Sequence, residues 1–176
     1  MSQKIKICDL LINKVLNNFE EKYSENFTRM FRVAKKMLGD GDNASDIVQE
    51  VFIYLFDKLN NGTVILHLNS WLYRATINKC IDMLRKQKRF QKIESVKDYK
   101  IGEDLIEKHE SVAAINCALS KLKPKEKVIA VLYSEGLSYK EIAQTTGIKF
   151  SSIGKTLART LEKLEKELKN QHYELY

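Results

Sequence analysis

The stretch from Leu137 to Ile153 constrains the fold of this chain more than any other part of it. It has the apolar spacing of two short helices with a turn between them. Ala143 is small where the helices must approach, and Gly147, four residues on, allows the positive φ that the turn needs. Ile153, six residues further, packs the second helix onto the first. This spacing predicts a helix-turn-helix.

The composition indicates a mostly helical protein. One proline and seven glycines occur in 176 residues, and a hydrophobic fraction of 44% is high enough for compact cores and too high for disorder. We expect an all-α chain with two small helical domains joined by a flexible linker. The predicted ranges are a first domain at 1–90, a linker at 91–110, a helix-turn-helix domain at 111–170 and a tail at 171–176.

The charge distribution follows the same division. The net charge is +7; residues 1–90 and 111–170 each carry +5, whereas residues 91–110 carry −2. Two basic modules on a tether favour a polyanionic partner such as nucleic acid. A basic charge alone is weak evidence, because many proteins without a nucleic-acid role share it.

Several classes of function find no support in the sequence. The cysteines are scattered and odd in number, and the histidines lie far apart, so we expect no disulfide framework and no metal site. No apolar run approaches the ~20 residues that span a bilayer, and the N-terminus lacks the apolar core of a signal peptide. We therefore expect a soluble, cytoplasmic chain without membrane insertion. No nucleophile–base set or phosphate-binding glycine loop predicts an enzyme or a cofactor.

A helix is predicted from Trp71 to about Arg89, with Asn69 or Ser70 as its N-cap. One of its faces carries arginines, an amide and the indole, a mixture that suits nucleic acid with accessible bases. The alternative is a solvated basic helix in which Trp71 belongs to the core. The candidate DNA contacts on and beside this face are Trp71, Arg74, Asn78, Lys79, Arg85 and Lys86.

Another helix is predicted from about Ala44 to Leu59, after a turn and cap cluster at 39–43. Its polar side carries Asp46, Gln49 and Glu50. Favourable interaction with the helix dipole explains Asp46 well, but it explains Gln49 and Glu50 less well because they lie beyond the first turn. Contact with a protein partner is a fair alternative for this patch.

The third block of the chain contains the helix-turn-helix. An apolar helix carrying Val112, Ile115, Leu119 and Leu122 opens the block, and Pro124 suits the first position of the helix that follows. The second helix of the motif, at about 151–169, would present its start to the major groove. A hairpin that only packs is the alternative. The candidate contacts there are Lys149, Ser151, Ser152, Lys155 and Arg159.

Four segments together resemble a known family. The stretches at 43–52 and 70–85 resemble the region 2 patterns of bacterial extracytoplasmic-function (ECF) sigma factors, and those at 122–127 and 135–143 resemble the start of region 4. The similarity runs from about residue 10 to 168. The sequence departs from the family pattern at Ser45, Lys127 and Gly154, and the glycine lies inside the expected recognition helix.

The resemblance implies a region 2 helical bundle, a region 4 helix-turn-helix and three partners: core RNA polymerase, promoter DNA and an anti-sigma factor. It implies that Asp46, Gln49 and Glu50 dock on the polymerase. It further implies that the helix at 71–89, with the loop at 60–68, captures an unpaired base of the −10 element, while the 111–170 module reads the −35 duplex. A stand-alone DNA-binding regulator and a sigma-like decoy are the competing hypotheses.

Overall fold

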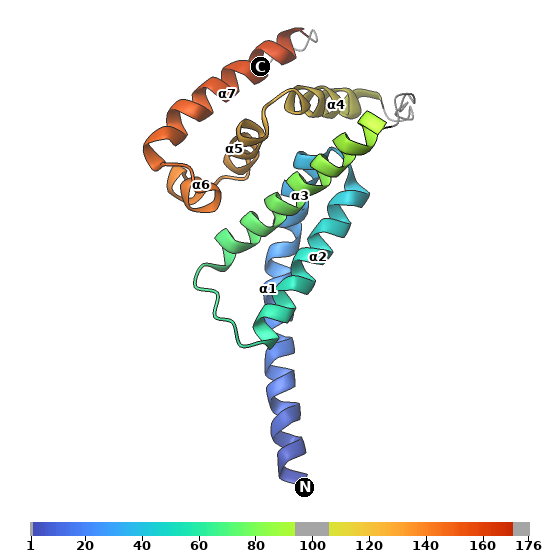
Figure 1. Ribbon diagram of the computed structural model, residues 1–176, viewed down its shortest axis with the longest axis vertical. Coiled ribbons are helices and arrows are strands. Elements are labelled where there is room, and N and C mark those ends of the chain that lie inside the picture. Colours follow the sequence, from blue (N-terminus) through green and yellow to red (C-terminus); the bar gives the residue numbers. More distant parts are fainter. Residues whose placement is uncertain (1, 94–105, 171–176) are drawn as a thin grey trace.

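The computed structural model describes residues 2–93 and 106–170, and within these ranges all regular structure is helical (Figure 1). The N-terminal unit consists of α1 (Ser2–Leu38), α2 (Gly41–Asn60) and α3 (Leu68–Ile93). The C-terminal unit consists of α4 (Ile106–Ser120), α5 (Pro124–Ser134), α6 (Tyr139–Thr146) and α7 (Phe150–Asn170). This all-α architecture confirms the predicted fold class, whereas residues 94–105 of the predicted linker and the predicted tail at 171–176 lie outside the described residues.

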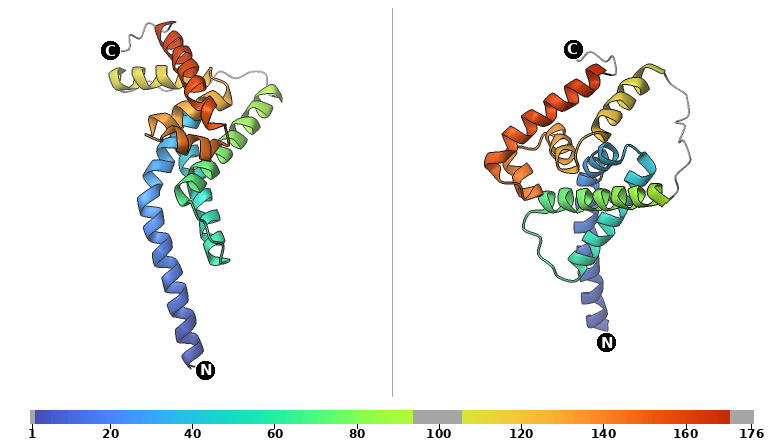
Figure 2. Two further views of the ribbon diagram at one scale, coloured as in Figure 1. Left: turned by 90° about the vertical axis from the view of Figure 1, so that its left-hand side faces the viewer. Right: turned by 45° about the horizontal axis from the view of Figure 1, so that its top comes forward.

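Helix α3 is the helix of the N-terminal unit that contacts α6 of the C-terminal unit. It packs against α1 and α2 on one side and against α6 on the other, while α5 also contacts α1. The N-terminal turns of α1 extend beyond the bundle, away from the C-terminal unit (Figures 1 and 2). The α2–α3 loop lies at the end of the N-terminal unit remote from α4 (Figure 1).

Side-chain and backbone groups define the helix starts in the N-terminal unit. The Asp40 carboxylate accepts hydrogen bonds from the backbone N–H groups of Asp42 and Asn43, so α2 begins at Gly41. The predicted cap of α3 is wrong. The Trp71 N–H donates to the His67 carbonyl at 3.0 Å, so the helix begins at Leu68, which also packs against the core. Asn69 and Ser70 therefore lie within its first turn.

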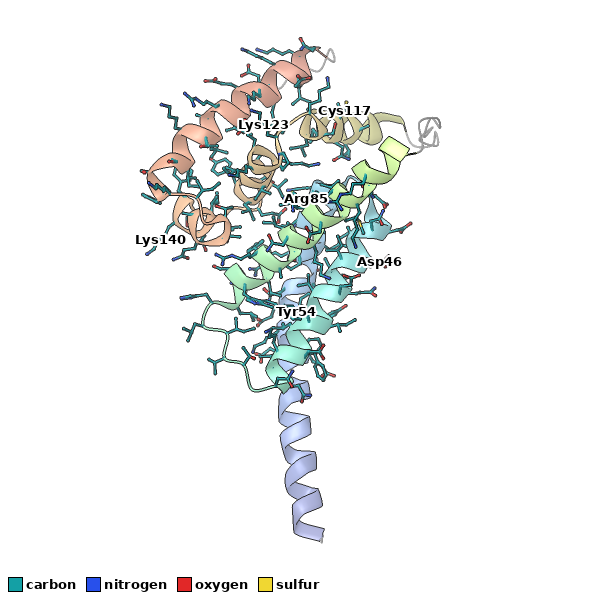
Figure 3. The ribbon with its side chains drawn as sticks, in the orientation of Figure 1. Asp46, Tyr54, Arg85, Cys117, Lys123 and Lys140 are labelled. Atoms are coloured by element: carbon teal, nitrogen blue, oxygen red, sulfur yellow. The ribbon has the colours of Figure 1, made fainter. Side chains whose placement is uncertain are left out.

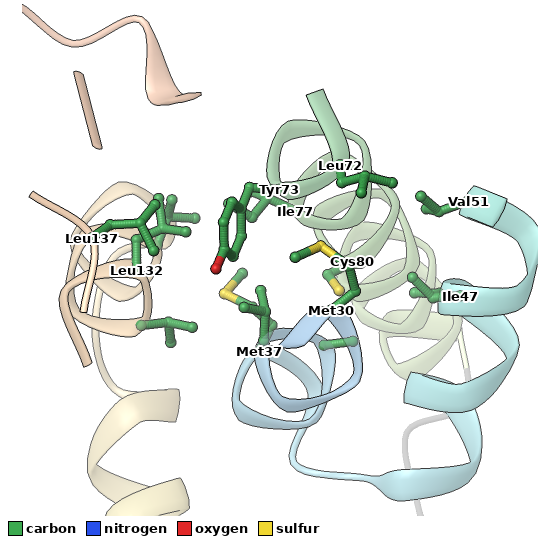
Figure 4. Close-up of a cluster of buried hydrophobic side chains, with 14 of the residues drawn as sticks. Met30, Met37, Ile47, Val51, Leu72, Tyr73, Ile77, Cys80, Leu132 and Leu137 are labelled. Carbon is green, nitrogen blue, oxygen red and sulfur yellow. The ribbon is translucent and has the colours of Figure 1, made fainter. Parts of the chain in front are cut away.

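One continuous apolar core joins the two units. Met37 of α1, Tyr73 and Ile77 of α3, and Leu132 and Leu137 of the C-terminal unit belong to the same cluster of buried side chains (Figure 4). Burial raises the pKa of the Tyr73 phenol above its usual value. The two predicted domains consequently pack as one body.

The predicted apolar pattern of the segment that opens the C-terminal unit is confirmed only in part. Val112 and Ile115 are exposed, whereas the small Ala114 and Ala118 pack with Leu168 of α7. Alanines let the two helix backbones approach closely, so this face is buried. Leu119 and Leu122 are buried as predicted, in a cluster with Ala130 of α5.

The helix-turn-helix has the predicted geometry. Ser138 caps α6 in a reciprocal capping box with Glu141, and the hydrogen bonds from Ser138 lower the pKa of that carboxyl group. Gly147 has a φ of 73° in the turn, as expected. Ile153 of α7 is fully buried, and Ala143 is partly buried against the same core. Pro124 begins α5.

Gly154 lies in α7 one residue after buried Ile153. A Cβ atom built at this glycine would lie 3.4 Å from Cε2 of Tyr139, which is ordinary van der Waals contact. Its backbone is helical, so no positive φ requires glycine here.

We predict opposite effects for two glycine substitutions in this motif. Gly154→Ala should raise the free energy of unfolding by up to ~1 kcal/mol, because alanine favours the helix and its methyl group fits beside Tyr139. Gly147→Ala should lower it by ~1–2 kcal/mol, because alanine is strained at a left-handed φ. Urea unfolding of both variants measures the difference. A loss of stability in Gly154→Ala would show that the space between Gly154 and Tyr139 is too small for a methyl group.

Candidate nucleic-acid interface

The predicted −10 contacts on α3 fall into two environments. Asn78, Lys79, Arg85 and Lys86 are exposed, and Trp71 is half-buried against the core. Arg85 forms only a 3.4 Å pair with Asp82 on its own helix, a contact that leaves the guanidinium available to a phosphate. These side chains are thus placed on the helix as the sequence pattern predicts.

Arg74 has a different role in this conformation. Its Nε donates to the Thr145 carbonyl at 3.0 Å, and its Nη2 donates to the Gln144 carbonyl. These carbonyls belong to the last turn of α6, where they have no intrahelical partner. The guanidinium therefore caps α6, and its charge complements the negative end of the helix dipole.

A groove of about 1230 Å³ is lined by residues of α3 and of the C-terminal unit, and we name it the interdomain groove. Arg74, Asn78 and Arg85 line one side, and Lys149 and Ser152 line the other. The structure thus brings predicted −10 and −35 contacts to a single site.

The lining of the interdomain groove contains both basic and apolar side chains. Arg85 on α3 and Lys123 before α5 lie on its two sides (Figure 3). Glu126 is the one acid among the described residues that line it, and its carboxylate is already paired with Lys163. Ile77, Ile81, Val128 and Ile148 supply apolar lining. The groove therefore offers both positive charge and apolar surface.

The other predicted −35 contacts lie outside this groove. Ser151, Lys155 and Arg159 are exposed, whereas Ile153 and Leu157 of the same helix are buried. The helical repeat therefore directs the basic residues away from the core. Their surface is open to a DNA duplex even though Lys149 and Ser152 face the groove.

The predicted docking patch lies on α2. Asp46 is exposed on the side of α2 remote from α5–α7 (Figure 3), and Gln49 is exposed nearby with a long 3.4 Å contact to Ser45. Glu50 pairs with Lys79 of α3 at 2.7 Å. A hollow between α2 and α3 is lined by Glu50, Lys79, Arg85 and Lys86, so the docking patch adjoins the basic α3 surface.

A second polar contact joins the units, and we name it the Glu135 cluster. The Glu135 side chain, at the end of α5, is 2% exposed and pairs with Arg32 at 3.0 Å and with Lys36 at 2.7 Å. Lys36 also contacts the Ser134 hydroxyl at 2.9 Å. A carboxylate at a helix C-terminus is unfavourable for the helix dipole, and the two cations of α1 offset that effect.

Sequence reasoning missed Tyr54 and Glu135. The Tyr54 ring stacks on Trp71, with ring centroids 5.6 Å apart. An aromatic side chain on the polar side of a predicted helix was the available signal for Tyr54. No local pattern identifies Glu135, because its partners lie about a hundred residues away.

Two other features bear on the classes of site. Within residues 2–93 and 106–170, no group of three histidine, cysteine or acidic residues is placed to hold a metal ion. Over the same part of the chain, no helix has the length and apolar character needed to cross a membrane.

Two family profiles match the two units. The profile described as Sigma-70 region 2 matches residues 23–90, and that described as Sigma-70, region 4 matches residues 113–164. The chain is 29% identical over 158 residues to the ECF RNA polymerase sigma factor SigE of Mycolicibacterium smegmatis, covering 84% of this chain but only 60% of SigE. It is 27% identical to the ECF RNA polymerase sigma factor SigW of Bacillus subtilis, covering 81% and 84% of the two chains.

The fold is also similar to that of a solved sigma factor. RpoE from Bartonella quintana, in complex with the anti-sigma factor NepR, superposes with a TM-score of 0.69 at 19% identity, covering 86% of this chain and 97% of that one. Both units contribute to this coverage, so the likeness extends over the two-unit fold. Because both profiles match in the expected order and the relatives are similar over most of this sequence, the chain belongs to the ECF sigma factor family.

Proposed function

We propose that this chain binds core RNA polymerase, directs it to a promoter by recognising −35 and −10 elements, and helps to open the DNA. The observation that carries the proposal is the presence of two basic surfaces, on α3 and α7, beside an acidic and polar patch on α2. The chain would act in the cytoplasm as a specificity subunit and not as a catalyst.

Each surface has a chemistry suited to one step. The start of α7 presents lysine, arginine and serine side chains, which contact phosphates and base edges in a major groove. The α3 face adds an amide and an indole to its positive charge, which suits DNA whose bases have become accessible. Asp46, Gln49 and Glu50 of α2 would dock on the polymerase.

The described conformation is a closed form of this promoter reader. Positions −35 and −10 are roughly 25 base pairs apart, or on the order of 80 Å of straight duplex. Here residues of α3 and the segment just before and at the start of α7 line one interdomain groove, and Arg74 donates a hydrogen bond to a carbonyl of α6. The two units must therefore separate before both elements can be bound together.

An anti-sigma factor would bind the closed form. The lining of the interdomain groove includes Arg85, Lys123 and Lys149 together with apolar side chains. An amphipathic partner segment with acidic side chains would complement both properties. Such a segment would cover predicted −10 and −35 contacts at the same time.

We predict that the chain together with core polymerase yields run-off transcripts from defined start sites on genomic templates. Core polymerase alone and the chain alone serve as controls. The reason is that promoter selection requires both DNA-contacting surfaces and the docking patch. The absence of any chain-dependent start site would rule out the proposed function.

We predict that the Gln49→Ala/Glu50→Ala double variant binds core polymerase at least tenfold more weakly and keeps its fold. Both side chains of the Glu50–Lys79 pair are exposed, so loss of the pair should change the free energy of unfolding by less than ~1 kcal/mol. Titration of labelled chain with core polymerase measures the affinity. The matched control is Glu20→Ala/Glu21→Ala, which removes two exposed acids of α1. Equal affinity of the two double variants would refute the docking assignment.

We predict that Glu135→Gln loosens the contact between the units. The isosteric change removes the charge that Arg32 and Lys36 neutralise, and the loss of even one charge-assisted bond of ~1.5 kcal/mol raises the open fraction about tenfold. Amide hydrogen exchange at the end of α5 should accelerate by that factor. The control is Glu165→Gln, which breaks an exposed pair with Lys169 within α7. Exchange as slow as in the control would mean that the Glu135 cluster does not hold the units together.

A further inference from the structure

The interdomain groove carries positive charge that the proposed DNA contacts do not use. Lys123 and Lys125, at the start of α5, line the groove and belong to neither the predicted −10 nor the predicted −35 contacts. With Arg85 and Lys149 they bring four exposed cations to one groove. Within residues 2–93 and 106–170, neither Lys125 nor Lys149 takes part in a salt bridge. The groove can therefore attract an anion while the two units are closed.

Two further polar features of the lining favour an anion. Residues 123–126 line the groove, so the first turn of α5 adds the positive end of its helix dipole. Thr145 of α6 also lines the groove and is 3% exposed, and its hydroxyl has no hydrogen-bond partner among the described residues. Buried hydroxyl groups normally have a partner, and a phosphate bound in the groove would bring an acceptor to this one.

The apolar part of the lining favours an organic anion over an inorganic one. Ile81 of α3 and Ile148, between α6 and α7, contribute partly buried side chains from the two units. An inorganic anion gains nothing from such surface, whereas a ligand with an organic ring system buries it. The groove has a volume of about 1230 Å³, which is enough for a ligand of nucleotide size.

The number of cations selects among organic phosphates. A single phosphate carries a charge of about −1.5 to −2 at neutral pH, which leaves at least two of the four cations unmatched. A chain of three phosphates adds roughly one charge for each further group, so its charge approaches that of the four cations together.

We propose that the interdomain groove binds a nucleoside triphosphate, which holds the two units closed. Its phosphates would pair with Lys123, Lys125 and Lys149, and its base would lie against Ile81 and Ile148. The inference rests on the proposed function, because closure matters for promoter binding only if the chain is a promoter reader. A ligand that contacts α3 and the C-terminal unit at once stabilises the closed form by its binding free energy.

Calorimetric titration of the full-length chain with ATP and, separately, with GTP tests the site. Mg²⁺ is left out so that the phosphates keep their full charge. We expect saturable binding, at least tenfold weaker binding of AMP because it lacks two phosphates, and weaker binding of inorganic tripolyphosphate because it lacks a base. No saturable binding of either nucleotide, or equal affinity for tripolyphosphate and both nucleotides, would overturn the proposal.

A double variant separates this site from general attraction to a basic protein. Lys123→Gln/Lys125→Gln removes two exposed cations of the groove and should weaken nucleotide binding at least tenfold. The control is Lys140→Gln/Lys166→Gln, which removes the same charge from exposed positions of the C-terminal unit that do not line the groove. An equal loss of affinity in the two double variants would overturn the site.

Amide hydrogen exchange tests the closing role of the nucleotide. Saturating ATP should slow exchange in α6, which packs on α3, about tenfold in the wild-type chain and not in Lys123→Gln/Lys125→Gln. Binding without this protection would overturn the closing role. Chain-dependent transcripts with no groove-dependent nucleotide binding would reject the nucleotide site alone, whereas groove-dependent binding with no transcripts would reject the proposed function.

Discussion

The packing of α3 against both units is the interaction on which this structure depends. Tyr73 and Ile77 are buried in the same cluster as Leu132 and Leu137, so α3 contributes to one core that both units share. The polar contacts follow from that placement. Arg74, one residue after Tyr73, reaches the open end of α6. The same helix therefore provides the predicted −10 surface and the contact that closes it.

When the two units separate, the contacts between them are lost and must be replaced by contacts with the polymerase. Each large apolar side chain that leaves the shared core gives up roughly 1.5–3 kcal/mol of burial. The polymerase must bind the open form more tightly than the closed form by at least the sum of such terms. The Glu135 cluster opposes opening less than apolar burial does, since Arg32 and Lys36 are partly solvated and regain water easily. A partner that fills the groove would shift the balance the other way.

Local features of the fold could be predicted from the sequence because local chemistry determines them. Ala143, Gly147 and Ile153 satisfy the steric needs of a turn between two helices, and the structure places them as expected. The start of α3 could not be predicted in the same way, because a backbone bond from Trp71 to His67 begins the helix and no side-chain cap does. The exposure of Val112 likewise depends on which face of α4 meets α7.

Contacts between distant segments escaped prediction for a related reason. The candidate residues of α3 and α7 are on exposed faces as the helical pattern requires, but nothing in the sequence indicates that Arg74 and Lys149 line one groove. The pairing of Glu135 with α1 has the same origin in tertiary packing. The exposed surfaces of α3 and α7 can be predicted from the sequence, whereas only the structure shows that residues of both helices line one groove.

The distance between the two units tests the central claim most directly. Cys117 is exposed, whereas burial raises the pKa of the Cys80 thiol to about 12, so spin labels attach selectively at Cys117 and at an added Asp57→Cys in a Cys8→Ser background. Pulsed electron spin resonance should give one narrow distance in the free chain and a longer one with core polymerase bound. An unchanged distance on polymerase binding, or a broad distribution in the free chain, would contradict the closed promoter reader.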